Sequence, residues 1–298
     1  MKSEVFTPTS LPPATRDKKR YGVLGFPVSH SLSPPMQEAG FGALGIPAEY
    51  FRIEIPDHGL SAALPNLRQA GLLGWNCTLP HKETMFSLCA EKDASAQESA
   101  SVNTVVVTTN GFRGFSTDAD GWEDAVREAW NLPLSTQRVL VLGCGGVGRT
   151  LAGRLARKGC RALTLANRNA EKALLLAEQL RPLGDTPVST VRWNSPELEK
   201  AVAGTDLLIQ ATRLGLSPED PLPVAENSLH PKLRVYDTIY RQDFTPLIQA
   251  ARARGCPALD GLGMLLHQGA RSLEIWTGKK PPLGIMRSAL EQAAGRPV

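Results

Sequence analysis

Several features are scarce in this chain of 298 residues, and each scarcity excludes a class of protein. Only 6% of the residues are aromatic, the formal net charge is a mild +4, and no apolar run approaches the ~18 residues that a membrane span needs. The basic residues are spread along the chain, whereas a nucleic-acid-binding face requires them to cluster. We therefore expect neither nucleic acid nor a membrane as a partner.

Cysteine and histidine are also scarce, with five of each. The cysteines show no C-x-x-C spacing and the histidines no H-x-x-x-H spacing, so we expect reduced thiols and no metal site. The N-terminus lacks the apolar stretch of a secretory signal. Together these absences indicate a cytoplasmic protein.

Hydrophobic residues make up 42% of the chain, which excludes disorder as a description of the whole. At ~150 residues per domain, the length favours two domains. From Tyr21 onward, short apolar runs alternate with helical patterns, and this alternation predicts a mainly parallel sheet with right-handed crossovers. The predicted strands are 21–25, 49–55, 74–78, 102–108, 139–142, 162–166, 207–211 and 233–238. The predicted helices are 34–44, 60–70, 82–90, 118–130, a helix ending near 158, 171–180, 196–204 and 246–255.

A glycine-rich turn follows the apolar run 139–142 and precedes a helix. Its glycines, Gly143, Gly145, Gly146 and Gly148, fit the G-x-G-x-x-G pattern of a dinucleotide site. The pattern supplies a tight turn, close approach to a pyrophosphate and free N–H groups at a helix start. Arg168 stands 20 residues beyond the last glycine, where an NAD site has an acid, so the charge favours the 2′-phosphate of NADP(H).

Four polar clusters lie in the first half, most of them at or after a predicted strand: residues 29–34, 76–82, 102–104 and 116–118. Ligands gather outside the carboxyl ends of strands in open α/β sheets. Hydroxyls, amides, one lysine and one aspartate gathered there suit a small, polyhydroxylated, anionic ligand. Read singly, Ser33-Pro34 is also a good helix start and Asp118 a good N-cap.

These motifs, in this order, resemble the shikimate dehydrogenase family over roughly residues 21–290. The matching stretches are 25–34, 74–82, 101–104, 117–118, the glycine turn with Asn167-Arg168, and 260–268. The resemblance implies a two-domain α/β enzyme that reduces 3-dehydroshikimate to shikimate with NADPH, in the route to aromatic amino acids. It implies a substrate domain with a mainly parallel sheet and a Rossmann-like NADP-binding domain.

The resemblance also implies roles for single residues. Lys82 and Asp118 would form the catalytic pair. Ser31 and Ser33 would bind the substrate carboxylate. The remaining substrate contacts would come from Asn76, Thr78, Asn103, Gln268 and Tyr240. Cofactor contacts would come from Gly143, Gly145, Gly146, Gly148, Asn167, Arg168 and Gly261.

The chemistry of ketone reduction fits the first pair. A positioned acid must deliver one proton to the developing alkoxide, and Lys82 can do so while its charge stabilises the oxyanion. Asp118 would orient Lys82. The alternative is that Lys82 only binds and a water donates the proton.

Some residues depart from the family pattern. Ser116 stands where Asn is usual, Gln210 and Arg213 replace Asn and Ser, and Gln37-Glu38 replaces His-Asn. These departures leave open a quinate or quinate/shikimate dehydrogenase and an enzyme acting on an aminated analogue. A non-catalytic NADP sensor is a separate alternative, and the presence of both Lys82 and Asp118 speaks against it. Serine at both 31 and 33 favours shikimate, because quinate-preferring members tend to carry threonine at the second position.

The position of Gln268, beyond the whole cofactor-binding series, predicts a discontinuous first domain. We expect a flexible N-terminal extension at 1–20, a substrate-binding and catalytic domain at 21–122 and 258–298, and an NADP-binding Rossmann domain at 123–257. The sequence leaves open whether the protein is a monomer or a homodimer.

Overall fold

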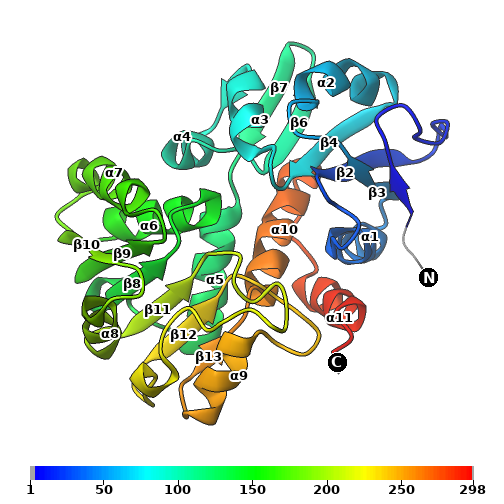
Figure 1. Ribbon diagram of the computed structural model, residues 1–298. Coiled ribbons are helices and arrows are strands. Elements are labelled where there is room, and N and C mark those ends of the chain that lie inside the picture. The colour runs from blue at the N-terminus through cyan, green and yellow to red at the C-terminus, as the bar shows by residue number, and fades with distance from the viewer. Residues whose placement is uncertain (1–3, 297–298) are drawn as a thin grey trace. The chain divides into compact units, whose positions relative to one another are not determined.

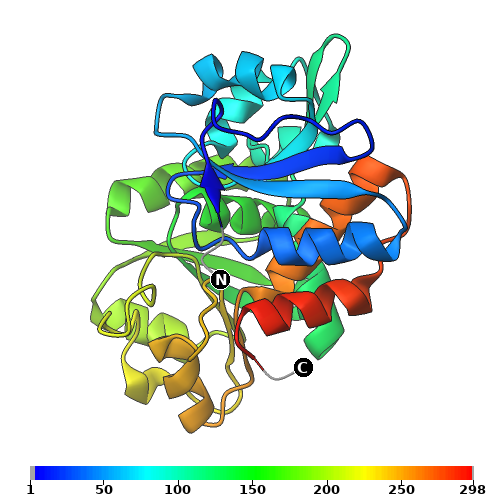
Figure 2. The same cartoon turned by 90° about the vertical axis from the view of Figure 1, so that its right-hand side faces the viewer.

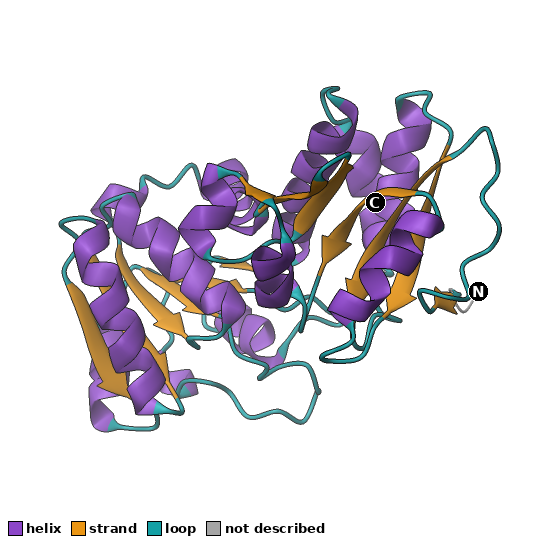
Figure 3. Cartoon of the chain, turned by 90° about the horizontal axis from the view of Figure 1, so that it is seen from above, coloured by secondary structure: helices purple, strands orange, loops and turns teal. Residues whose placement is uncertain are grey.

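The computed structural model describes residues 4–296, and the chain divides into two compact units. The first consists of Met1–Gly121 with Leu265–Val298, and the second of Trp122–Met264. Each contains one sheet between helices (Figure 3).

The first unit contains a seven-stranded sheet in the order β1-β3-β2-β4-β6-β7-β5 (Figure 1). In chain order its strands are β1 (Val5–Phe6), β2 (Lys19–Gly25), β3 (Ala48–Glu54), β4 (Leu72–Cys77), β5 (Glu91–Lys92), β6 (Thr104–Thr108) and β7 (Gly111–Phe115). All pairings are parallel except those of β6, which runs antiparallel to both β4 and β7. The Asn110-Gly111 turn closes the β6–β7 hairpin, with Gly111 at a φ of +133° that favours glycine.

The helices of this unit are α1 (Ser33–Ala43), α2 (Leu60–Gln69), α3 (Lys82–Leu88), α4 (Ala94–Ser99) and α11 (Leu283–Ala293). Figure 2 shows α1 and α11 side by side. Two further helices cross the unit boundary along the chain, α5 (Asp118–Trp130) and α10 (Leu262–Thr277). Several of the few aromatic residues pack together here, since the Tyr21 ring lies 4.8 Å from Phe41 and 4.9 Å from Trp276.

The expectation of a separate, flexible extension at 1–20 is wrong for the described residues 4–20. Val5 and Phe6 form β1, which extends the sheet by pairing with β3, and the Phe6 ring packs edge-on against Phe51 at 5.5 Å. Arg20, only 2% exposed, donates to the carbonyl of Pro12 at 2.8 Å. This edge strand has only two residues, which is too few to show a periodic pattern. Residues 1–3 lie outside the described part.

The second unit contains a six-stranded, all-parallel sheet in the order β10-β9-β8-β11-β12-β13. Its strands are β8 (Arg138–Leu142), β9 (Ala162–Asn167), β10 (Val188–Arg192), β11 (Leu207–Gln210), β12 (Arg234–Asp237) and β13 (Ala258–Leu259). Counted within the unit, this order is 3-2-1-4-5-6, the order of a dinucleotide-binding Rossmann sheet. The strand order reverses between β8 and β11, which is where such sheets bind their ligand.

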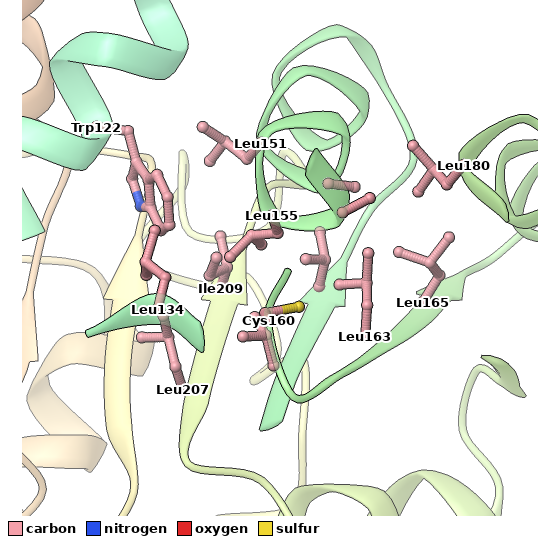
Figure 4. Close-up of a cluster of buried hydrophobic side chains, with 14 of the residues drawn as sticks. Trp122, Leu134, Leu151, Leu155, Cys160, Leu163, Leu165, Leu180, Leu207 and Ile209 are labelled. Carbon is pink, nitrogen blue, oxygen red and sulfur yellow. The ribbon is translucent and has the colours of Figure 1, made fainter. Parts of the chain in front are cut away.

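Helices cover both faces of this sheet: α6 (Gly146–Arg157), α7 (Ala170–Leu180), α8 (Pro196–Ala203) and α9 (Pro246–Ala253). Leu151 and Leu155 of α6 pack with Leu163, Leu165 and other buried side chains in one core (Figure 4). A second core contains Leu198 of α8 and Leu247 of α9. Burial on both faces explains why β8 and β11 are continuous apolar runs.

The unit boundary corrects part of the predicted domain division. Residues 258–264 were assigned to the first domain, yet they lie in the second unit. The reason is that Ala258 and Leu259 form β13 and pair with β12 at the edge of the second sheet.

Candidate functional site

Three strand ends meet in the first unit because β6 is antiparallel to its neighbours. Asn76 of β4 pairs with Thr104 of β6, and Thr104 in turn pairs with Phe115 of β7. The start of β6 therefore lies beside the ends of β4 and β7. Lys82, Asn103 and Asp118 are all within a few residues of these ends, which is why they come together.

Lys82 and Asp118 form an ion pair in which Nζ lies 2.5 Å from Oδ2. The Lys82 side chain is 20% exposed and that of Asp118 is 8% exposed, so the ammonium retains access to a ligand. Asp118 begins α5, where the helix dipole favours an acid, whereas Lys82 begins α3, where the dipole disfavours a cation. A lysine at a helix start, where the dipole disfavours it, and paired with a nearly buried acid is typical of a functional group.

Asn103 is only 2% exposed and contacts three other residues of the site. Its Nδ2 donates to Asp118 Oδ1 at 3.0 Å, to Thr117 Oγ1 at 2.9 Å and to Gln268 Oε1 at 3.2 Å. Its Oδ1 accepts from the backbone N–H of Thr117 at 2.8 Å. Asp118 is thus held through both oxygens, by Asn103 on one and Lys82 on the other, and Gln268 of α10 joins the same group.

Asn76 lies beneath this group, in a fully buried network. Its Nδ2 donates to Asn103 O, Thr104 Oγ1 and Ser272 Oγ at 2.9, 3.1 and 2.9 Å, and its Oδ1 accepts from Tyr50 at 2.7 Å. Burial raises the pKa of the Tyr50 phenol well above its usual value, so it remains a donor. Both amide N–H groups of Asn76 are in use in this network, and through one of them Asn76 holds the backbone of Asn103.

Ser31 and Ser33 lie where β2 leads into α1. The backbone N–H of Ser33 donates to Ser31 Oγ at 3.3 Å, so the two predicted carboxylate ligands are joined. Ser33 is 6% exposed, whereas Ser31 is half-buried. Pro34 and Pro35 follow, and as prolines they give the start of α1 no N–H groups. The hydroxyls of Ser31 and Ser33 are therefore the donors that this helix start offers. Thr78 is half-buried just after β4.

The glycine turn of the second unit divides into packed and open positions. A Cβ on Gly148 would overlap the carbonyl oxygen of Gly143, and one on Gly143 would lie 2.7 Å from the carbonyl oxygen of Ala211. A Cβ on Gly145 or Gly146 would meet nothing within 4 Å. Gly143 and Gly148 let α6 pack against β8 and β11. Gly145 and Gly146 leave the backbone open at the N-terminus of α6, as a bound pyrophosphate requires.

Asn167 ends β9 beside that turn, and Arg168 follows it. Asn167 Oδ1 accepts from the Cys144 N–H at 3.1 Å, and its Nδ2 donates to Asn169 O at 2.9 Å. Asn167 therefore connects the glycine turn to the loop that bears the exposed Arg168.

Two further predicted residues, Tyr240 and Gly261, belong to the second unit. Tyr240 is half-buried in the loop after β12. Asp237, at the end of β12, holds this loop through the Ile239 N–H at 3.0 Å and Thr245 Oγ1 at 2.6 Å. A Cβ on Gly261 would overlap the Thr238 carbonyl, so packing against the same loop requires glycine there.

Two departures from the family pattern have structural roles. Gln37 donates from α1 to the carbonyl of Gly269 at 2.9 Å, next to Gln268. Gln210 closes the turn after β11, since its Nε2 donates to Leu214 O at 2.6 Å and its Oε1 accepts from the Thr212 N–H at 2.8 Å.

Sequence reasoning missed three residues that hold the predicted ones in place, namely Tyr50, Arg52 and Ser272. Tyr50 and Arg52 lie on β3, and Ser272 follows Gln268 by one helical turn. The i, i+4 spacing from Gln268 was the one available signal for Ser272.

Within residues 4–296 there is no group of three or more His, Cys, Asp or Glu side chains that could hold a metal ion. No helix in that range is long and apolar enough to cross a membrane.

Comparison with known proteins places this geometry in context. Residues 23–105 match the shikimate dehydrogenase substrate-binding domain, residues 125–216 the shikimate/quinate 5-dehydrogenase model, and residues 261–291 the shikimate 5′-dehydrogenase C-terminal domain. NADP(+)-dependent shikimate dehydrogenases from Rubrobacter xylanophilus and Methanopyrus kandleri are 41% and 35% identical. These alignments cover 94% and 90% of this chain, and 98% and 93% of the relatives.

Solved structures agree. Shikimate dehydrogenase from Aquifex aeolicus has a TM-score of 0.85 at 32% identity, covering 93% of this chain and 99% of that one. The Thermus thermophilus enzyme in complex with NADP(H) and shikimate has a TM-score of 0.81 at 34% identity, covering 92% and 99%. Quinate dehydrogenase from Corynebacterium glutamicum with NAD scores 0.83 at 28% identity, covering 93% and 100%. This chain, an α/β protein with a Rossmann-like second unit, belongs to the shikimate dehydrogenase family.

Proposed function

We propose that the protein is an NADP-dependent shikimate dehydrogenase, which reversibly reduces 3-dehydroshikimate to shikimate in aromatic amino acid biosynthesis. The observation that carries this proposal is the Lys82–Asp118 pair, joined at 2.5 Å and braced by Asn103 at the ends of β4 and β7. The names of the Rubrobacter and Methanopyrus relatives support the choice of reaction and cofactor.

The proton in this reaction would belong to Lys82. In the direction of reduction, its ammonium donates to the oxygen of the former ketone, and in oxidation the amine takes the proton back. Asp118 fixes the position of Nζ and balances its charge, while Asn103 keeps the carboxylate from rotating. The positive charge at Nζ also stabilises negative charge developing on the substrate oxygen.

The residues of the second unit fit NADP(H). Gly145 and Gly146 leave space at the start of α6 for a pyrophosphate, and the exposed Arg168 offers a guanidinium to a 2′-phosphate. When bound, the dinucleotide supplies the hydride. Gly143, Gly148, Asn167 and Gly261 would shape its binding loop, and Tyr240 would contact the substrate.

The substrate would be held in the first unit. The hydroxyls of Ser31 and Ser33 would donate hydrogen bonds to its carboxylate. Thr78 and Gln268 would bind ring hydroxyls. Asn103 would exchange its hydrogen bond to Gln268 for one to the substrate. Asn76 would act by holding Asn103.

We also propose a cytoplasmic location, supported by five free cysteines. Every group named here comes from one chain, which suits a monomer and a homodimer alike.

The test is to follow formation of the reduced cofactor by the wild-type protein with shikimate and then with quinate, as NADPH from NADP+ and as NADH from NAD+. The proposal predicts that shikimate with NADP+ has the highest kcat/KM. A clear preference for quinate would favour the alternative that the Corynebacterium neighbour represents. Tight NADPH binding without turnover on either substrate would identify a sensor.

A further inference from the structure

We propose that Arg52, in the middle of β3, is a positioning residue for the carboxylate end of the substrate. It would act by fixing the backbone of Ser31. The inference rests on the proposed function, which assigns Ser31 and Ser33 to the substrate carboxylate.

The geometry is specific. Arg52 Nε and Nη2 donate to the same carbonyl oxygen, that of Ser31, at 2.9 and 2.6 Å. β3 lies between β1 and β2, with Arg52 paired to Val5 on one side and to Val23 on the other. The guanidinium therefore extends from a strand that is anchored along both edges. Two charged donors on one carbonyl make a strong and directional contact.

The loop that it holds is anchored near β2, where the Phe26 N–H donates to the Leu79 carbonyl at 2.9 Å and Val28 is buried. Between β2 and α1, Ser31 makes a turn through its N–H to the Val28 carbonyl at 3.0 Å. A cleft of about 900 Å³ borders residues 29–32 and Arg52, so core packing does not fix the loop on that side. Ser31 Oγ then accepts from the Ser33 N–H, which makes the position of Ser33 depend on that of Ser31.

Attraction between the charge of Arg52 and the substrate carboxylate is not the role that we assign to this residue. Glu38, another residue of the cleft, lies close enough to feel its charge: burial raises the pKa of the Glu38 carboxyl, and the guanidinium of Arg52 opposes that rise. The positive charge of Arg52 is thus partly balanced within the cleft, and the directional contact to Ser31 remains as its distinct contribution.

The experiment compares Arg52→Met and Arg52→Lys with wild type in shikimate oxidation, measuring KM for shikimate, KM for NADP+ and kcat separately. The matched control is Arg68→Met, because Arg68 also donates to a backbone carbonyl of the same unit, that of Thr108 at 3.0 Å. A direct dissociation constant for shikimate, from calorimetry, accompanies each variant, and a melting curve shows that it is folded.

Loss of charged hydrogen bonds to the loop should raise KM and Kd for shikimate roughly tenfold in Arg52→Met. kcat should stay within about threefold and KM for NADP+ should be unchanged, because the reacting groups are elsewhere. Arg52→Lys should be intermediate, since lysine keeps the charge and loses the paired donors. Arg68→Met should match wild type.

Unchanged KM and Kd for shikimate in a folded Arg52→Met protein would overturn the proposal. So would a loss that falls equally on kcat and on KM for NADP+. If Arg52→Met does not fold, Arg52→Lys decides alone through its shikimate KM. An inactive wild type would instead contradict the proposed function, so the two failures are distinct.

Discussion

At the scale of single residues, the side chains that contact Asp118 differ from those that only hold its neighbours in place. Lys82 and Asn103 hold its two oxygens, and beneath them Asn76, Tyr50 and Ser272 use their polar groups on one another. A buried network of this kind is costly to leave half-satisfied, so each member restrains the others. The reactive groups are therefore fixed before a substrate arrives.

Arg168 is the residue on which the choice of cofactor depends. Replacing it with Gln should raise KM for NADP+ by roughly 10- to 100-fold, because a charged hydrogen bond to a phosphate contributes about 1.5–3 kcal/mol. KM for NAD+ should hardly change, since that cofactor has no 2′-phosphate. Steady-state assays with both cofactors check this expectation, and equal effects on NADP+ and NAD+ would refute it.

Sequence patterns were sufficient for residues whose role depends on local context. The caps of α8 and α9 at Ser195 and Thr245 follow from capping preferences. Asp118 is instead the first residue of α5, where the helix dipole favours an acid. The sequence could not predict the hydrogen bonds of the Asn76 amide, because its partners Tyr50 and Ser272 are 26 and 196 residues away. Arg52 was missed for the same reason: a lone arginine in a strand gives no signal until the loop across from it is placed.

At the scale of elements, the glycine turn between β8 and α6 combines two requirements. Gly143 and Gly148 are needed by the fold, since their neighbours leave no space for a side chain, whereas Gly145 and Gly146 are bordered by open space. The sequence pattern G-x-G-x-x-G does not distinguish these two kinds of glycine.

A pair of alanine variants tests this division. Gly148→Ala should lower the melting temperature, because its methyl group would overlap the Gly143 carbonyl. Gly145→Ala, at a φ of −79° that alanine adopts readily, should keep the melting temperature and raise KM for NADP+. Melting curves and cofactor KM values for both proteins are the measurement. The interpretation fails if Gly145→Ala is the less stable of the two.

Antiparallel pairing within an otherwise parallel sheet is the other element-scale feature. The β6–β7 hairpin brings Asn103 and Asp118 beside Lys82. Strand β7 itself was not predicted, because Gly111–Phe115 contains two glycines and an arginine among its five residues. The edge strands β1 and β5 have two residues each, too few for any period-2 pattern to show.

At the scale of the whole molecule, each of the two units has its own buried core, and the first is assembled from two stretches of chain. The second unit includes a fully buried carboxyl group, Asp237, with 0% exposure. Burial raises the pKa of Asp237 to about 7, although its bonds to Thr245 and to the Ile239 N–H oppose the rise.

This raised pKa has a defined effect on stability. A carboxyl group whose folded-state pKa lies above its unfolded value contributes stability that is present below pH ~4 and is lost as the pH rises through 7. For a rise from 3.8 to about 7, the contribution is on the order of 4 kcal/mol. Asp237→Asn stays uncharged, so the stability difference between wild type and variant should shrink or reverse between pH 4.5 and 7.5.

Urea unfolding at a series of pH values measures that difference, with the exposed Asp243→Asn as the control. The control should follow the wild-type pH profile. Parallel pH profiles for wild type and Asp237→Asn would show that Asp237 does not titrate in this range.

The central claim is that Lys82, held by Asp118, supplies and removes the proton in the reduction of 3-dehydroshikimate. The most direct measurement is kcat for shikimate oxidation by Lys82→Met, together with Kd for shikimate from calorimetry. Loss of a positioned acid–base group should lower kcat by ~10²–10⁴-fold while Kd changes far less. A Lys82→Met protein that keeps wild-type kcat would contradict the claim and would assign the proton to a water.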